Sequence, residues 1–271
     1  MERALILSGG GARGAFQVGV WRYLQERGWS PDLICGASAG AINAAAIGSG
    51  IAPAELARMW RQYSRRRVYR LSLPAFLGAL VAGKRVAPLM DTAPLRATLT
   101  EHIDIPALRR CPIQIRIPII HLRTSRLHYV TQREVTVDHL MAAGAMPILF
   151  PWAEINGEAY WDGGVMANTP LMPAVAAGAD EIVVVLLSPV GKFPQPVPRT
   201  LMEAAERAFE HFLIGSCESI PEATKRACRV RVVAPEKPMG LASLIRFNPR
   251  RAEALVADGY RCARSQLGDA I

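Results

Sequence analysis

The stretch LILSGGGARGAFQVGV, residues 5–20, places an apolar run before a cluster of glycines and a helix-like sequence after it. Gly9, Gly11 and Gly14 match Gly-x-Gly-x-x-Gly after an expected strand, which is the fingerprint of dinucleotide binding. The same loop would offer backbone N–H groups at a helix N-terminus to any negative charge, including an oxyanion that exists only in a transition state. The spacing alone leaves both interpretations open.

The rest of the chain repeats this alternation of strand and helix. Its 271 residues, 51% hydrophobic and 20% charged, suffice for one substantial core. Alternating elements indicate an α/β fold, a three-layer α/β/α sandwich with a mostly parallel central sheet. We predict strands at ALILS, DLICG, IQIRIPII, LHYVTQ, AYWDGG, EIVVVLL and RVRVVAP, and helices near residues 15–27, 39–50, 136–145, 170–178, 200–215 and 250–267.

We expect a single domain over residues 1–271. Residues 51–110 interrupt the alternation with helical sequence punctuated by proline and glycine and without a clear strand, so they are predicted to form a helical cap inserted over the sheet. Core motifs occupy residues 3–187, and a last strand and helices are expected in 188–271.

Charge and cysteine content narrow the range of partners. The net charge of +9 favours anionic partners. No zinc-finger spacing, RNP-like motif or basic heptad helix is present, so phospholipid is favoured over nucleic acid. Five cysteines without a Cys-x-x-Cys pair favour a reducing compartment, and we expect no metal and no cofactor.

Two segments bear on localisation. The start MERALILSGGG lacks a long apolar region, so we expect no cleaved signal peptide and a mature protein that begins here. Residues 33–54 carry no charge, but glycines, serines, Asn43 and Pro53 break the stretch, which favours a buried strand and helix over a membrane span. A cytoplasmic protein, peripherally bound to membrane at most, is the expectation.

A second motif follows the second expected strand. Gly36-Ala37-Ser38-Ala39-Gly40 matches Gly-x-Ser-x-Gly, in which small residues make room for a serine on a sharp turn between strand and helix. The pentapeptide is also compatible with a simple packing turn. Its position at the carboxyl end of a strand, where open α/β sheets place their sites, favours a nucleophilic Ser38.

The second strand also decides between the two interpretations of the glycine loop. A dinucleotide site needs an acidic residue at the carboxyl end of that strand, but the only candidate, Asp32, precedes it. Neighbouring strands would bring the loop and Ser38 to one crevice. We therefore assign the amides of Gly9, Gly10 and Gly11 to an oxyanion hole. Arg13 either supports this loop or simply covers the helix start.

Three motifs together resemble the patatin-like phospholipase family, in its bacterial form. They are GGGARG (residues 9–14), GASAG (36–40) and DGG (162–164), with weaker similarity in MAAGAMPILFPW and NTP; the resemblance spans about residues 3–187. It implies a catalytic dyad, with Ser38 as the nucleophile and Asp162 as its base. A carboxylate can serve as that base only if it is held close and partly desolvated, because its ordinary pKa is low.

A histidine triad is the competing mechanism. Chain order would nominate His211, which lies in a helical stretch rather than on a loop after a strand. The other four histidines precede Asp162 in no recognisable motif; they are His102, His121, His128 and His139. We expect all five to be surface or packing residues.

The insertion contains a basic segment. Residues 56–90 include eight cations and no acidic residue. A helical period would place Arg58, Arg61 and Arg65 on one face and apolar residues on the opposite one. The apolar LSLPAFLGALVAG follows, too short to span a bilayer. This order suits attachment to an anionic membrane surface, although a solvated face is an equally good interpretation.

These inferences converge on a serine hydrolase that cleaves acyl esters of phospholipids or lysophospholipids. Two alternatives remain: a non-catalytic lipid- or nucleotide-binding module on the same fold, and an esterase or thioesterase that acts on soluble acyl substrates.

Overall fold

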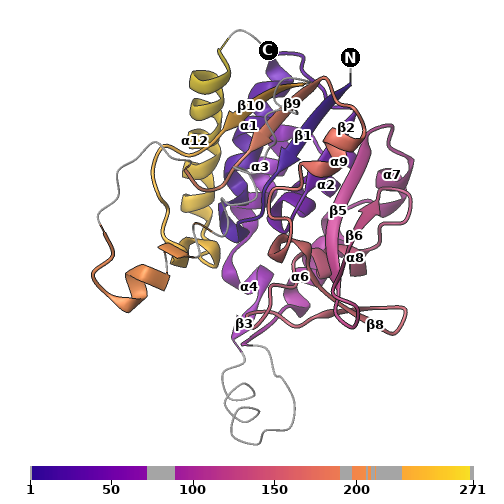
Figure 1. Ribbon diagram of the computed structural model, residues 1–271, viewed down its shortest axis with the longest axis vertical. Coiled ribbons are helices and arrows are strands. Elements are labelled where there is room, and N and C mark those ends of the chain that lie inside the picture. The colour runs from indigo at the N-terminus through magenta and orange to yellow at the C-terminus, as the bar shows by residue number, and fades with distance from the viewer. Residues whose placement is uncertain are drawn as a thin grey trace, which may run out of the picture.

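The computed structural model describes residues 2–71, 89–189, 197–205, 207–208, 211 and 228–268. Within them the centre of the molecule is an eight-stranded sheet in the order β10-β9-β1-β2-β5-β8-β7, with β6 paired to β5 (Figure 1). Neighbours among the first five strands are parallel, whereas β6, β7 and β8 pair antiparallel. The strands are β1 (Arg3–Leu7), β2 (Leu33–Gly36), β5 (Gln114–His121), β6 (Arg126–Thr131), β7 (Ala153–Ile155), β8 (Glu158–Asp162), β9 (Glu181–Val185) and β10 (Arg229–Val233).

Helices cover both faces of this sheet. The α-helices are α1 (Ala15–Glu26), α2 (Ala39–Gly48), α3 (Pro53–Gln62), α4 (Arg65–Val68), α6 (Ala93–His102), α7 (Ile105–Arg110), α8 (Val137–Ala143), α9 (Met172–Ala176) and α12 (Pro249–Leu267). Helices α1, α2, α3 and α12 share the larger core with one face of β1, and α9 shares a smaller core with the other face. The three-layer α/β/α fold is therefore confirmed.

The predicted elements can be compared one by one. All seven predicted strands are present, as are the helices expected near 15–27, 39–50, 136–145, 170–178 and 250–267. In the 200–215 stretch the described residues 201–205, 207–208 and 211 are helical, and the remaining ones lie outside the described residues. Strand β7 was not predicted.

The insertion differs from expectation in two ways. It contains a short antiparallel pair, β3 (Arg70–Leu71) with β4 (Met90–Asp91), where no strand was expected. Helix α3 ends at Gln62, so Arg65 belongs to the separate helix α4 and does not share a helical face with Arg58 and Arg61. Tyr63 and Ser64 leave helical geometry and break the period that the sequence had suggested.

Strand β5 decides where Asp162 lies. Its residues 114–116 pair with β2 and its residues 119–121 pair with β8. Since β6 occupies the other edge of β5 from Arg116 to His121, β2 and β8 must share one edge. They meet it from opposite directions, so the carboxyl ends of both strands face each other across Pro118. Proline has no N–H to donate to a neighbouring strand, which suits this gap.

Asp32 lies at the opposite end of β2 from Ser38. Its carboxylate accepts a hydrogen bond of 2.9 Å from the amide of Arg3, at the start of β1. The acidic residue that a dinucleotide site requires is thus at the wrong end of the sheet, as the sequence predicted.

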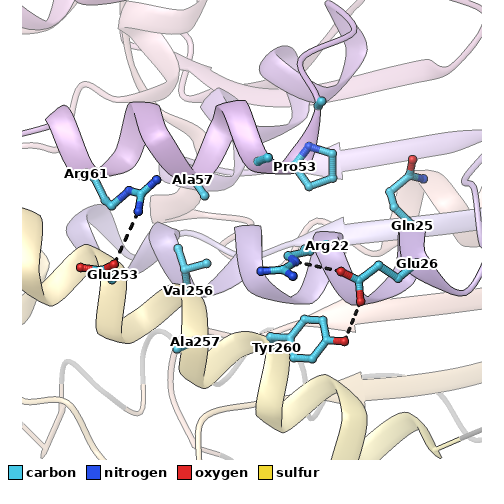
Figure 2. Close-up of a pocket in the computed structure, with 12 residues that line it drawn as sticks. Arg22, Gln25, Glu26, Pro53, Ala57, Arg61, Glu253, Val256, Ala257 and Tyr260 are labelled. Atoms are coloured by element: carbon cyan, nitrogen blue, oxygen red, sulfur yellow. Dashed lines mark hydrogen bonds and ion pairs between the residues drawn. The ribbon is translucent and has the colours of Figure 1, made fainter.

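Helix α3 borders a groove on the helical layer. The groove lies between α1, α3 and α12, and its lining includes small residues such as Ala57 on α3 and Ala257 on α12 (Figure 2). An ion pair of 3.5 Å between Arg61 and Glu253 crosses it, and both side chains are largely exposed. Exposed pairs contribute little stability, so α3 is held mainly by its buried side.

Candidate active site

Ser38 occupies a strained turn between β2 and α2. Its backbone has φ 51° and ψ −121°, which a residue with a side chain adopts only when its surroundings enforce it. A Cβ on Gly36 would lie 2.3 Å from the carbonyl oxygen of Gly40, and one on Gly40 would lie 2.2 Å from that of Leu7. The small residues of the motif therefore serve the close contacts that the sequence suggested.

Asp162 ends β8 directly before the 3-10 turn η2 (Gly163–Val165). Its carboxyl is fully buried, and Oδ1 accepts a hydrogen bond of 2.7 Å from the amide of Gly164. Burial raises the pKa of Asp162 to about 7, and the Gly164 amide and the Ser38 hydroxyl oppose this increase. The close approach of this turn to β5 needs glycine, because a Cβ at Gly163 would lie 2.2 Å from the carbonyl carbon of Pro118.

Ser38 and Asp162, which are far apart in sequence, are neighbours in the fold. The Ser38 hydroxyl is close enough to influence the pKa of the carboxyl. Nevertheless Oδ2 of Asp162 is buried and has no geometrically formed hydrogen bond within the described residues. The hydroxyl of Ser38 and the carboxyl of Asp162 are therefore adjacent, and Oδ2 is the carboxyl oxygen that has no hydrogen bond among the described residues.

The glycine loop follows β1 and continues into the 3-10 helix η1 (Gly11–Gly14). The loop touches the nucleophile, since a Cβ on Gly9 would lie 3.1 Å from Cβ of Ser38. The Gly9 amide, however, already donates a bond of 3.0 Å to the carbonyl of Asn168. In the described part of the chain the amides of Gly10, Gly11 and Ala39 have no such acceptor, so these N–H groups remain free for a ligand.

Arg13 is completely buried beneath this loop. Its guanidinium donates to the side chains of Ser243 (2.6 Å) and Ser188 (2.9 Å) and to the carbonyls of Leu187 (3.2 Å) and Gly240 (2.9 Å). Its own amide donates to the carbonyl of Gly10. The guanidinium and the backbone amide of Arg13 are thus both bonded within the protein. Arg13 joins the loop to the segment after β9 and to the 3-10 helix η3 (Leu241–Leu244).

Asn168 is the residue near the site that sequence reasoning did not single out. It is buried, its carbonyl accepts from Gly9, and its side-chain oxygen would lie 2.4 Å from a Cβ on Gly9 and 3.4 Å from one on Gly164. It therefore packs between the glycine loop and the Asp162 turn. Its only signal in the sequence was the short NTP motif.

None of the five histidines, all of which the structure describes, forms a hydrogen bond with Ser38 or Asp162. His121 contacts Thr124 and Glu158, His139 contacts Thr136, and His211 is exposed. In the same ranges no group of three or more His, Cys, Asp or Glu side chains is arranged to hold a metal ion. No helix among the described residues is long and apolar enough to cross a membrane.

Several known proteins are similar to this chain in sequence. The chain is 29% identical over 182 residues to a cGAMP-activated phospholipase of Pseudomonas aeruginosa, a match that covers 61% of this chain and 53% of that protein. It is 26% identical over 185 residues to an uncharacterized NTE family protein of Mycobacterium bovis, covering 68% and 49%. The chain thus spans about half the length of these relatives.

One solved structure and one family model also match the chain. VipD of Legionella pneumophila aligns with 98% of this chain and 67% of its own, with a TM-score of 0.43 and 13% identity. The family model described as patatin-like phospholipase matches residues 5–175, well over half of the chain. The protein that carries the glycine loop, the Ser38 turn and the Asp162 turn in this order therefore belongs to the patatin-like phospholipase family.

Proposed function

We propose that this protein is a serine acyl hydrolase that cleaves carboxylic esters of phospholipids or lysophospholipids through Ser38 and Asp162. The observation that supports this most strongly is the position of a strained serine beside a buried carboxyl whose pKa is near 7. A serine needs an adjacent base to become nucleophilic, and a base is most useful when its pKa lies near the working pH.

The reaction proceeds in two halves. Ser38 Oγ attacks the ester carbonyl carbon, and its proton passes to Oδ2 of Asp162. When the tetrahedral intermediate collapses, the ester C–O bond breaks and the departing alcohol takes that proton. Water then attacks the acyl-enzyme and gives a proton to Asp162; the acid is released, and Ser38 recovers the proton.

The oxyanion of each intermediate is stabilised by backbone amides. Gly10 and Gly11 supply two N–H groups, and Ala39, which directly follows the nucleophile, offers a third. Gly9 was expected among these donors, but its amide is used by Asn168, so it shapes the loop instead. Arg13 acts as a positioning residue for the loop, because its guanidinium is spent on neighbouring segments.

A surface formed by Arg65, Arg66, Arg70, Leu71 and Ile148 is the proposed site of membrane attachment. The three arginines are exposed and have no carboxylate partner in the described part of the chain, and Leu71 and Ile148 are 57% and 73% exposed. Cations beside apolar side chains suit the interface of an anionic bilayer. The apolar stretch 72–83, Lys84 and Arg85, on which the sequence argument also relied, lie outside the described residues.

Backbone bonds connect this attachment surface to Asp162. Leu71 pairs with Met90, and the amide of Met90 bonds to the carbonyl of Leu149 at 3.0 Å. The same segment, at Ala145, accepts a bond of 3.1 Å from the amide of Asp162. In Figure 1, α4 and β3 lie toward the same end of the molecule as β8. A protein attached here would bring lipid to the catalytic end of the sheet.

Replacing Ser38 with Ala should abolish hydrolysis of a chromogenic ester, because it removes the attacking oxygen while the fold keeps its packing. Labelling by a fluorophosphonate probe should vanish with it, and the melting temperature should stay close to that of the parent. Ser49→Ala, at the end of the same helix, is the control and should keep full activity. A folded Ser38→Ala variant that retains most activity would exclude Ser38 as the nucleophile.

Asp162→Asn should reduce kcat by several orders of magnitude, because an amide cannot accept the serine proton. In the parent, Asp162 must be ionised to act, so kcat/KM for a soluble ester should rise with pH and level off above a midpoint near 7. His211→Ala should change the rate by a few-fold at most. If His211→Ala is as inactive as Asp162→Asn, a conventional triad replaces the dyad.

The same carboxyl should make stability depend on pH. Its pKa is raised in the folded protein from the ordinary 3.8 to about 7, so folding favours the protonated form. The stability gained is complete below about pH 4 and is lost as pH rises through 7. The raised pKa of Asp162 contributes at most roughly 4 kcal/mol to the free energy of unfolding. Thermal melts from pH 4 to 8 should therefore be flatter for Asp162→Asn than for the parent; parallel curves would contradict the raised pKa.

Replacing Arg65, Arg66 and Arg70 together with Gln should weaken binding to anionic vesicles by about 100-fold, since each cation near such a surface contributes roughly 1 kcal/mol. Hydrolysis of a soluble ester should not change. The matched control replaces Arg58, Arg61 and Arg67 with Gln. It removes the same number of positive charges, but these arginines are paired with Glu55, Glu253 and Glu101. If the two triple variants sediment equally with anionic vesicles across a salt series, this surface is not the site of membrane attachment.

A further inference from the structure

A buried chain of hydrogen bonds runs from α3 to the start of the glycine loop. Trp60 Nε1 donates to Oδ1 of Asn43 at 2.8 Å, and Nδ2 of Asn43 donates to Oε1 of Gln17 at 2.8 Å. Gln17 Nε2 then donates to the carbonyl of Ser8 at 2.7 Å. All three side chains are at least 97% buried, so water cannot replace these bonds.

Two members of this hydrogen-bond chain lie next to the proposed catalytic machinery. The Ser8 carbonyl directly precedes the glycine loop, and Asn43 is on α2, the helix that begins after Ser38. A second bond from Nδ2 of Asn43, 3.0 Å long, holds the carbonyl of Gly14 at the end of the loop. The side chains of Gln17 and Asn43 thereby hold both ends of the loop at a fixed distance from the helix of the nucleophile.

Trp60 connects this hydrogen-bond chain to α3. Its ring packs against the loop, since a Cβ on Gly14 would lie 2.7 Å from the indole and 2.9 Å from Cβ of Ala39. The other side of α3 faces the groove of Figure 2, where the ion pair that crosses to α12 among the described residues joins the exposed side chains of Arg61 and Glu253. The docking of α3 thus depends on its buried side, which includes the Trp60 bond.

We propose that Gln17, Asn43 and Trp60 form a positioning chain for ester hydrolysis, through which the seating of α3 sets the geometry of the oxyanion amides of Gly10 and Gly11. This inference rests on the proposed function. None of the three side chains is assigned contact with substrate. They act on the rate because oxyanion donors stabilise a transition state only when they are held in place before it forms.

The test compares two buried tryptophans. Trp60→Phe keeps an aromatic ring but removes the bond to Asn43. Trp21→Phe is the matched control, because Trp21 is equally buried and its Nε1 has no hydrogen-bond partner within the described residues. Both variants should lose similar stability from the smaller ring. They are assayed well below their melting temperatures, with a soluble p-nitrophenyl ester and a fluorophosphonate probe.

We expect Trp60→Phe to lower kcat and the labelling rate by about 10-fold or more, since removal of one oxyanion donor outright costs about 100- to 1,000-fold. KM should stay within about threefold of the parent value. The midpoint of the pH profile should not move, because Asp162 is not a member of the hydrogen-bond chain. Trp21→Phe should stay within twofold of the parent.

A second variant tests whether the three residues act as one unit. Gln17→Met removes the bonds to Asn43 and Ser8 with little change in shape. Combined with Trp60→Phe, it should lose much less than the product of the two single losses, because both break one chain.

Two results would overturn the positioning chain: equal kcat for Trp60→Phe and Trp21→Phe, or independent, multiplicative losses in the double variant. A parent protein that neither hydrolyses esters nor reacts with the probe would instead refute the proposed function, and the inference with it.

Discussion

The site depends on one strand that pairs with two others along a single edge. Strand β5 gives its first residues to β2 and its last to β8, and these two run toward each other. Ser38 follows one carboxyl end and Asp162 forms the other. A carboxyl ending an antiparallel strand can therefore reach a serine that follows a parallel strand, although more than 120 residues separate them.

This arrangement buries a titratable group and strains a backbone, and both have costs. Burial disfavours the carboxylate and raises the pKa of Asp162 toward the range in which it can exchange a proton with a serine. The positive φ of Ser38 persists because the contacts at Gly36 and Gly40 leave the turn no alternative. Stability given up at this site is consistent with a catalytic rather than a merely structural role.

The surroundings divide into two kinds of support. Arg13 and Asn168 fasten the glycine loop to the segments after β9 and after Asp162, and the chain of Gln17, Asn43 and Trp60 fastens it to α2 and α3. Buried polar groups of this kind need hydrogen-bond partners, because the free-energy cost of leaving one unpaired exceeds the net stability that one hydrogen bond contributes. The loop is thus fixed by directional bonds as well as by packing.

The sequence alone determined the local units: the strand, glycine loop and helix at residues 4–27, the second strand with its Gly-x-Ser-x-Gly turn, and the apolar strand at residues 181–187. These follow from short-range periodicity and from residues that only tight turns require. It also named Ser38 and Asp162 as candidates. Tertiary structure alone decided that they are neighbours, because that depends on which strand pairs with which edge of β5. It likewise decided that Asn168 takes the amide of Gly9, that Arg65 leaves the helix of Arg61, and that Trp60 reaches Asn43, since hydrogen-bond partners distant in sequence leave no periodic signal.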